Sequence, residues 1–338
     1  MDDRGSKRRI DLIRESAGSL TIGDDSDGAI VSMATIAGRL YGIKERAIYV
    51  IALADDIDPE RTREDIPNTT QKIFDVGSKD EIVIRLLLTA IELFKKDRLS
   101  DSVYFEKALA IVVEIQKDLA AASLIVDEAE AFLAKARESQ LHPKGNAVSL
   151  PSFPALHSQT KSFIQKLDHA TQNIFNLCCV FYDQGVLRKA GKWLDGLANH
   201  LSKTLEPNED FARFATELAT FGKIVRNTRH CIEHPKANQR IDLHDYRITA
   251  TRSLAEPTIS VIHDETPVDP TPIAEFMRYF YEQALTGAEL LMAFLAGYHV
   301  AEFGQFPIGV GEVPENQRSN GVRFGYLINF GGTVHRLG

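Results

Sequence analysis

Residues 208–235 have the sequence NEDFARFATELATFGKIVRNTRHCIEHP, which carries the strongest structural and chemical signal in the chain. Proline precedes this segment and Pro235 ends it, so the pattern predicts one helix over 208–234. At about 100° per residue, its cationic and titratable side chains gather within about 140° of one face. They are Arg226, Arg229, His230, Glu233 and His234. The opposite face is mainly apolar and comprises Phe214, Leu218, Phe221, Ile224, Val225, Thr228, Cys231 and Ile232.

Small residues precede the charged cluster on the same face of this helix. Ala212, Ala215, Ala219 and Gly222 lie near the helical angle of Arg226. A face in contact with water normally carries Lys, Glu or Gln, whereas small residues at this spacing let a second helix approach closely. We therefore expect another helix to cover this face, and the Arg/His cluster to lie where that contact ends. Such an arrangement is typical of a site at a seam between subunits or domains.

The charge pattern marks the same segment. The net charge of the chain is −8, which excludes a generally basic nucleic-acid binder. Between Lys223 and Arg240, however, there are five Lys or Arg residues and a single acid, Glu233. Guanidinium groups bind phosphodiesters, and imidazoles transfer protons near neutral pH. The segment therefore predicts a local phosphate-binding site that needs neither a cofactor nor a metal.

The wider sequence predicts a mainly α-helical protein. We expect a flexible leader over 1–27, a helical domain over 28–140, a linker over 141–154 and a helical bundle over 155–338. The expected helices span about 29–53, 78–94, 103–137, 155–182, 186–205, 208–234 and 272–303. The bundle should carry a small β element: a hairpin within about 243–264, formed by the runs 246–251 and 258–263, and a C-terminal strand over about 322–329. The sole tryptophan, Trp193, is predicted to lie in the core.

The composition indicates a cytoplasmic location. The 338 residues are 44% hydrophobic and 25% charged, as in globular proteins. The cysteines Cys178, Cys179 and Cys231 have no CxxC spacing, which favours reduced thiols. The most apolar stretch, 290–301, falls short of the ~20 residues that a membrane span needs. We expect no membrane association.

Arg229-His230-Cys231-Ile232-Glu233-His234 has the order Arg, a polar residue, three further residues and His. This pattern resembles the signature of the HEPN superfamily (higher eukaryotes and prokaryotes nucleotide-binding). The resemblance covers about 155–303, with 236–270 as an inserted hairpin. It implies a helical bundle that forms a homodimer, and a metal-independent endoribonuclease of toxin or phage-defence systems. An antitoxin or defence partner protein is implied as well.

The resemblance also implies roles for individual residues. His234 would act as general base or acid toward the 2′-hydroxyl, Arg229 would bind the scissile phosphate, and His230 would orient both. The product would be a 2′,3′-cyclic phosphate. Outside the motif, we expect the neighbouring polar side chains to bind RNA or a nucleotide; these are Arg226, Lys223, Asn227 and Arg240.

Two alternatives stay open. The residues His230-x-x-Glu233-His234 also match the HxxEH zinc peptidase motif, with Glu302 or Glu312 as a third ligand. In the other alternative the cluster is a non-catalytic nucleotide- or RNA-binding or dimerisation module, in which Glu233 pairs with Arg229 or Arg226. Sensitivity to a chelator separates the zinc enzyme from the ribonuclease.

Overall fold

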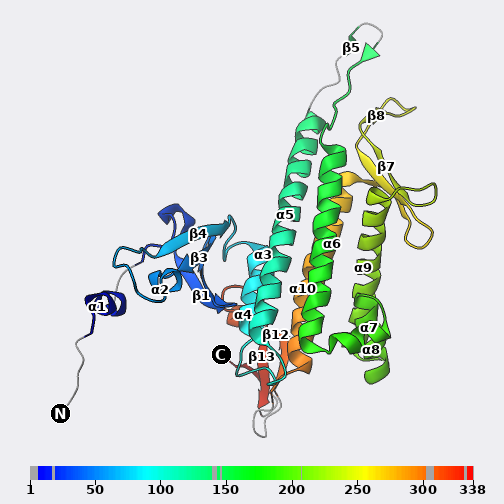
Figure 1. The fold of residues 1–338 in the computed structure, drawn as a ribbon. Helices are drawn as coiled ribbons and strands as arrows, with labels where there is room; N and C mark the ends of the chain where they lie inside the picture. The colour runs from blue at the N-terminus through cyan, green and yellow to red at the C-terminus, as the bar shows by residue number, and fades with distance from the viewer. Residues whose placement is uncertain are drawn as a thin grey trace, which may run out of the picture.

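The computed structural model describes residues 7–16, 20–138, 143–144, 147–206, 208–301, 308–330 and 333–337. Its centre is a bundle of four long helices that run alternately up and down (Figure 1). These helices are α5 (Phe105–Glu138), α6 (Leu156–Phe181), α9 (Asp210–Glu233) and α10 (Ile273–Tyr298). The helix predictions over 103–137, 155–182 and 208–234 are confirmed, and so is the helix predicted over 272–303, although it ends at Tyr298 and residues 302–303 lie outside the described residues.

Two short helices connect α6 to α9 at one end of the bundle. They are α7 (Gln184–Ala190) and α8 (Leu194–Thr204). The single helix predicted over 186–205 is therefore broken at residues 191–193. The break contains Gly191 and Trp193, and the φ of Trp193 is +54°. The end of α7 and the start of α8 are thereby held close together, which positions the loop between them.

The prediction of a mainly α fold is wrong, because the part of the chain that the structure describes is 51% helical and 20% strand. The largest error lies in the helix expected over 29–53 within the helical domain. This segment forms three strands of an antiparallel sheet with the order β1-β2-β3-β4. The strands are β1 (Ile30–Ile36), β2 (Arg39–Lys44), β3 (Ile48–Ala52) and β4 (Thr69–Phe74).

A tight turn explains why strands form here. Ala37 and Gly38 have φ of +48° and +74°, which suits a two-residue hairpin between β1 and β2. The apolar spacing of 3–4 residues that favoured a helix is coincidental, since Met33 is 51% exposed while Ile36 and Ile43 are buried. Ile43 instead belongs to the face of the sheet that joins the main core.

The remaining strands are more extensive than the predicted β element. One three-stranded sheet has the order β11-β10-β7, another has the order β12-β13-β14, and two two-stranded ribbons accompany them. The strands are β5 (Pro143–Lys144), β6 (Ala147–Val148), β7 (Arg240–His244), β8 (Arg247–Ile248), β9 (Leu254–Ala255), β10 (Thr258–Ile262), β11 (Val268–Pro272), β12 (Ile308–Glu312), β13 (Phe324–Phe330) and β14 (Thr333–Arg336).

The predicted pairing of 246–251 with 258–263 is wrong. Strand β10 pairs with β7 and β11, whereas β8 pairs with β9. The C-terminal strand predicted over 322–329 is confirmed as β13, and its partners are β12 and β14. The alternating sequence pattern predicted the strand itself. It did not predict the partner strands, because pairing depends on contacts between residues distant in sequence.

Short helical segments complete the architecture. They are α1 (Arg9–Glu15), α2 (Ala54–Ile57), α3 (Glu81–Val83), a π-helical turn (Ile84–Leu88) and α4 (Thr89–Leu93). Part of the predicted leader is thus helical, and residues 1–6 and 17–19 lie outside the described residues.

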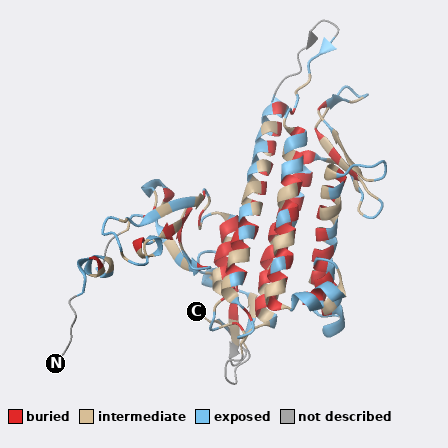
Figure 2. Ribbon diagram, viewed as in Figure 1, coloured by how far each residue is buried: buried red, intermediate tan, exposed pale blue. Residues whose placement is uncertain are grey.

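One hydrophobic core extends through most of the chain. It includes Ile36 and Ile43 from the first sheet, inward-facing residues of the bundle helices, and Phe324 and Tyr326 of β13. Figure 2 shows the buried residues concentrated on the inner faces of the bundle. The helices α5 and α6, on either side of the predicted linker over 141–154, pack against each other. The division into two domains stays a prediction. In the part of the chain that the structure describes, no helix is both long enough and apolar enough to cross a membrane.

His299 at the end of α10 gives a pH-dependent prediction. Its ring contacts those of Phe181 and Tyr182, and burial lowers its pKa from the ordinary value of 6.5. The unfolded chain therefore binds a proton at this ring more readily than the folded protein does. The free energy of unfolding is not affected by this ring above about pH 6.5, and it decreases as the pH falls below that value. We expect His299→Phe to lose less stability than the wild type between neutral pH and pH of about 5. Chemical denaturation at both pH values measures this; parallel losses in the two proteins would contradict it.

Candidate functional site

The small residues of α9 are covered by a helix of the same chain. Ala212, Ala215, Ala219 and Gly222 are all buried. A Cβ atom added at Gly222 would lie 2.9 Å from Leu194 Cδ1 at the start of α8. The prediction that this face packs against another helix is confirmed. Beyond the contact, α9 continues toward the β7–β10 sheet and carries the Arg/His cluster (Figure 1).

Arg229 is held between two carboxylates. Its guanidinium lies 3.3 Å from Asp168 Oδ2 on α6 and 2.8 Å from Glu233 Oε2 one turn further along α9. The Asp168 side chain is only 1% exposed, and Gln172 donates a hydrogen bond of 2.6 Å to its Oδ2. Its other oxygen, Oδ1, is buried without a hydrogen-bond partner among the described residues. The charge of Arg229 thus stabilises a buried acid.

Glu233 has two donors. Gln165 on α6 donates a hydrogen bond of 3.1 Å to Glu233 Oε1, and Arg229 contacts the other oxygen. The Gln165 hydrogen bond is the largest effect that lowers the pKa of Glu233; Arg229 adds to it and desolvation opposes it. The carboxylate therefore stays ionised at neutral pH. The ion pair between Glu233 and Arg229, which the non-catalytic alternative predicted, is therefore present. The binding function in that alternative stays a prediction.

Arg226 lies in a different environment from Arg229. Its guanidinium carbon stacks over the Trp193 ring at 4.4 Å from the centroid, and burial lowers its pKa. The more distant charges of Asp168 and Asp195 oppose that shift. Within the described residues, Arg226 has no ion pair. It is a half-buried cation whose charge is not matched by a carboxylate in contact.

Trp193 presents an aromatic surface beside this cation. The indole is 37% exposed, so its predicted place in the core is wrong. Its edge meets the Phe175 ring at a centroid distance of 5.9 Å, and it lines a cavity of about 320 Å³. The other residues of this lining are Phe175, Arg188, Gly191 and Lys192. Like Arg226, neither Arg188 nor Lys192 has an ion pair in the described part of the chain.

Gly196 fixes the loop that presents Trp193. A Cβ atom at this position would lie 2.4 Å from the Leu187 carbonyl oxygen and 2.9 Å from that of Gly191. Because both neighbours are backbone atoms, the start of α8 approaches α7 this closely only with glycine. The loop between the helices depends on this contact.

Substitution of Gly196 by alanine should therefore lower the free energy of unfolding by about 1–3 kcal/mol. Gly297→Ala on α10 is the matched control, since the one described atom that its Cβ would meet is Val310 Cβ, at 3.5 Å. Alanine loses less backbone entropy than glycine when a helix forms. That variant should therefore be as stable as the wild type or more stable by about 0.5–1 kcal/mol. Urea denaturation compares the two; equal stabilities would show that the α7–α8 contact is not tight.

The other predicted side chains divide into two groups. His230 and His234 are exposed at the end of α9, with ring centroids 6.0 Å apart. Lys223 pairs with Glu265 at 2.6 Å, and Arg240 with Asp242 at 3.1 Å. Asn227 donates a hydrogen bond of 3.1 Å to Thr266 Oγ1. The structure therefore brings Arg226, Arg229, His230 and His234 to one end of α9, while Lys223, Asn227 and Arg240 bind neighbouring loop and strand residues.

Sequence reasoning missed the contribution of α6 and the α7–α8 loop. Gln165, Asp168 and Gln172 form a polar row at helical spacing within a helix whose other buried positions are mostly apolar. This polar row was the feature of the sequence that could have indicated a partner for Arg229. No local pattern identifies Trp193 as the partner of Arg226, because 33 residues separate them in the sequence.

The geometry does not favour the zinc alternative. Within the ranges that the structure describes, no three His, Cys, Asp or Glu side chains are arranged to hold a metal ion. Glu233 is held by Arg229 and Gln165, and Glu312 pairs with Arg318 and Arg323 at 2.9 and 3.0 Å. Glu302, the other predicted third ligand, lies outside the described residues.

Comparisons with family models, with curated proteins and with solved structures found no match to this chain. The class of protein is therefore defined by its own architecture: an antiparallel four-helix bundle with appended sheets and a basic, aromatic cluster where the α7–α8 loop meets α9.

Proposed function

We propose that this chain binds RNA or a nucleotide through the Arg/Trp site, which comprises Arg188, Lys192, Trp193 and Arg226. The observation that carries the proposal is the half-buried guanidinium of Arg226, stacked on Trp193 without a carboxylate partner among the described residues. A buried charge is costly unless it is paired, and a phosphate would supply the missing anion. Other arginines of α9 and β7 already have such partners.

The aromatic component favours nucleic acid over a simple anion. A partly exposed indole offers a face on which a base can stack, and cations beside it follow the phosphate backbone. Single-stranded RNA combines both features, since its bases are free to stack. The net charge of −8 restricts such binding to this local patch.

Fluorescence anisotropy with a labelled single-stranded RNA tests the binding proposal. Measurements in EDTA at several salt concentrations should give an affinity that falls as salt rises, because phosphate contacts release counterions. A double-stranded DNA of equal length serves as the competitor and should bind more weakly. Absence of RNA and nucleotide binding at low salt would contradict the proposal.

A second candidate function is metal-independent endoribonuclease activity of the HEPN type. It is favoured by the exposed His230 and His234 rings, 6.0 Å apart and next to Arg229. Imidazoles at this position are accessible to a 2′-hydroxyl and able to exchange protons with it. The same resemblance supports a homodimer and an antitoxin or defence partner, for which light scattering and co-purification are the tests.

Cleavage of RNA in EDTA decides between binding alone and catalysis. If the chain is a nuclease, His234→Ala should lower the rate about 100-fold or more, and His230→Ala should also lower it. Both residues are exposed, so neither variant should change stability by more than about 0.5 kcal/mol. A wild type that binds RNA but leaves it intact, or a His234→Ala variant with full activity, would leave only the binding function.

A further inference from the structure

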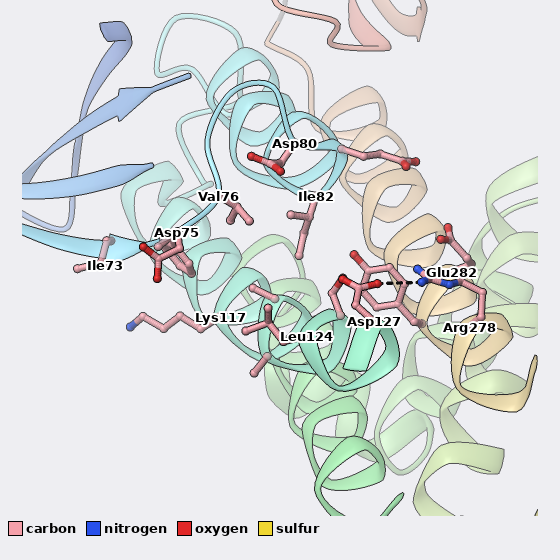
Figure 3. A pocket seen from close by; sticks show the side chains of 16 residues that line it. Ile73, Asp75, Val76, Asp80, Ile82, Lys117, Leu124, Asp127, Arg278 and Glu282 are labelled. Atoms are coloured by element: carbon pink, nitrogen blue, oxygen red, sulfur yellow. Dashed lines mark hydrogen bonds and ion pairs between the residues drawn. The ribbon is translucent and has the colours of Figure 1, made fainter. Parts of the chain in front are cut away.

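A second cavity lies far from the Arg/Trp site along the chain, between the segment after β4 and the helices α5 and α10 (Figure 3). Its volume is about 470 Å³, within the range of roughly 300–1,000 Å³ that holds small organic ligands. Asp75, Val76 and Asp80 approach from the β4–α3 segment, Leu124 and Asp127 from α5, and further residues from α10.

The floor of this cavity is apolar. Ile82 and Tyr281 are buried there, with exposed fractions of 6% and 5%, and Ala120 and Ala121 of α5 also line the cavity. Leu124 at the rim is 64% exposed, which leaves a large apolar side chain in contact with water. A ligand with a hydrocarbon or aromatic body would cover this surface and gain the free energy of its burial.

The rim of the cavity is acidic. Five carboxylates and two cations line it; the carboxylates are those of Asp75, Asp80, Glu81, Asp127 and Glu282. The cations are Lys117, which pairs with Glu114 at 2.5 Å, and Arg278. The lining therefore carries an excess of negative charge.

Three nearby cations do not remove this excess, because each is shared between carboxylates. Lys72 lies 3.5 Å from Asp75 and 3.0 Å from Asp27. Arg278 binds both Asp127 and Glu130, at 2.9 and 2.7 Å. Arg85 contacts Glu81 at 2.9 Å and Glu282 at 3.7 Å, and it also pairs with the buried Glu289. Each arginine thus pairs with two or three carboxylates, and the rim keeps a net negative charge.

We propose that this cavity binds a small organic cation, an amine with an apolar body. The apolar floor would receive the body and the acidic rim would hold the ammonium group. Charge complementarity selects a cation, and the floor favours an organic one over a metal ion, for which no set of ligands gathers among the described residues. The site is independent of the Arg/Trp site and of its proposed function.

Two fluorescent probes with the same body test this proposal: dansyl cadaverine, which ends in an ammonium, and a dansyl alkylcarboxylate of equal length. The ammonium probe should bind at least about tenfold more tightly, and this preference should shrink as salt rises. Equal binding of both probes, or tighter binding of the carboxylate, would overturn the proposal. So would binding of a long basic peptide without binding of the small amine.

Variants on one helix locate the bound probe. Ala121→Trp places an indole in the cavity and should abolish binding, while Ala134→Trp, at an exposed position of the same helix α5, should leave it unchanged. Asp75→Asn combined with Glu282→Gln should weaken binding of the ammonium probe and should not weaken binding of the carboxylate probe. Circular dichroism confirms that each variant is folded. Unchanged affinity in Ala121→Trp would place the probe elsewhere and contradict the assignment.

Discussion

Arg229→Met should lower the free energy of unfolding by about 3–5 kcal/mol, because it leaves the carboxylate of Asp168 buried without its cation. Asp168 is 1% exposed, whereas Arg229 is 33% exposed and retains Glu233 as a second partner. Removal of the arginine is therefore more costly than removal of the acid. Urea denaturation at neutral pH measures the loss.

A double variant separates charge from packing. Asp168→Asn combined with Arg229→Met removes both charges and keeps an amide for the hydrogen-bonding environment that Gln172 provides. We expect it to recover much of the stability lost in Arg229→Met, because the uncompensated charge is gone. A loss below about 1 kcal/mol in the single variant, or no recovery in the double variant, would show that the buried acid does not depend on Arg229.

This expectation bears on the role of Arg229 in the proposed ribonuclease. A guanidinium held by two carboxylates has less capacity to bind a scissile phosphate than one with no acid in contact. Of the arginines on α9, Arg226 is the one without a carboxylate in contact among the described residues, and it lies at the edge of the covered stripe of small residues. A phosphate contact from Arg226 is therefore central to our account.

Trp193→Leu should weaken binding of single-stranded RNA by about 10–100-fold, the range that corresponds to loss of one stacked base. Arg226→Met should weaken it as well and reduce the slope of affinity against salt by about one phosphate contact. Arg213→Met is the matched control, since Arg213 is an exposed arginine of the same helix that pairs with Asp210 at 2.6 Å. Anisotropy titrations over a range of salt measure all three. Loss of affinity in Arg213→Met equal to that in Arg226→Met would indicate diffuse electrostatic attraction and not a built site.

Local patterns in the sequence predicted the bundle well. The periodic apolar residues of α5, α6, α9 and α10 made each helix recognisable, and the alanines and glycine of α9 marked its contact with α8. These features depend on neighbours within a few turns. The first sheet was missed because Met33, Ile36, Leu40 and Ile43 imitate a helical stripe, while the Ala37-Gly38 turn decides the conformation.

The site was only partly predictable for a related reason. Arg226, Arg229, His230 and His234 share one helix, so their common location followed from helical geometry. Asp168 and Trp193, which distinguish the two arginines, come from other elements brought alongside α9 by the bundle. The sequence also gave no indication that Lys223 and Arg240 pair with nearby acids, since the turn and strand that supply these acids were not placed correctly.

The intrinsic fluorescence of Trp193 tests the central claim most directly, because it is the only tryptophan in the chain. Titration of the wild-type protein with unlabelled single-stranded RNA should quench its emission, with a midpoint equal to that found by anisotropy. The Arg226→Met variant should need more RNA to reach the same quenching. If RNA binds while the emission of Trp193 stays unchanged, the bases do not stack at this site and the account is wrong.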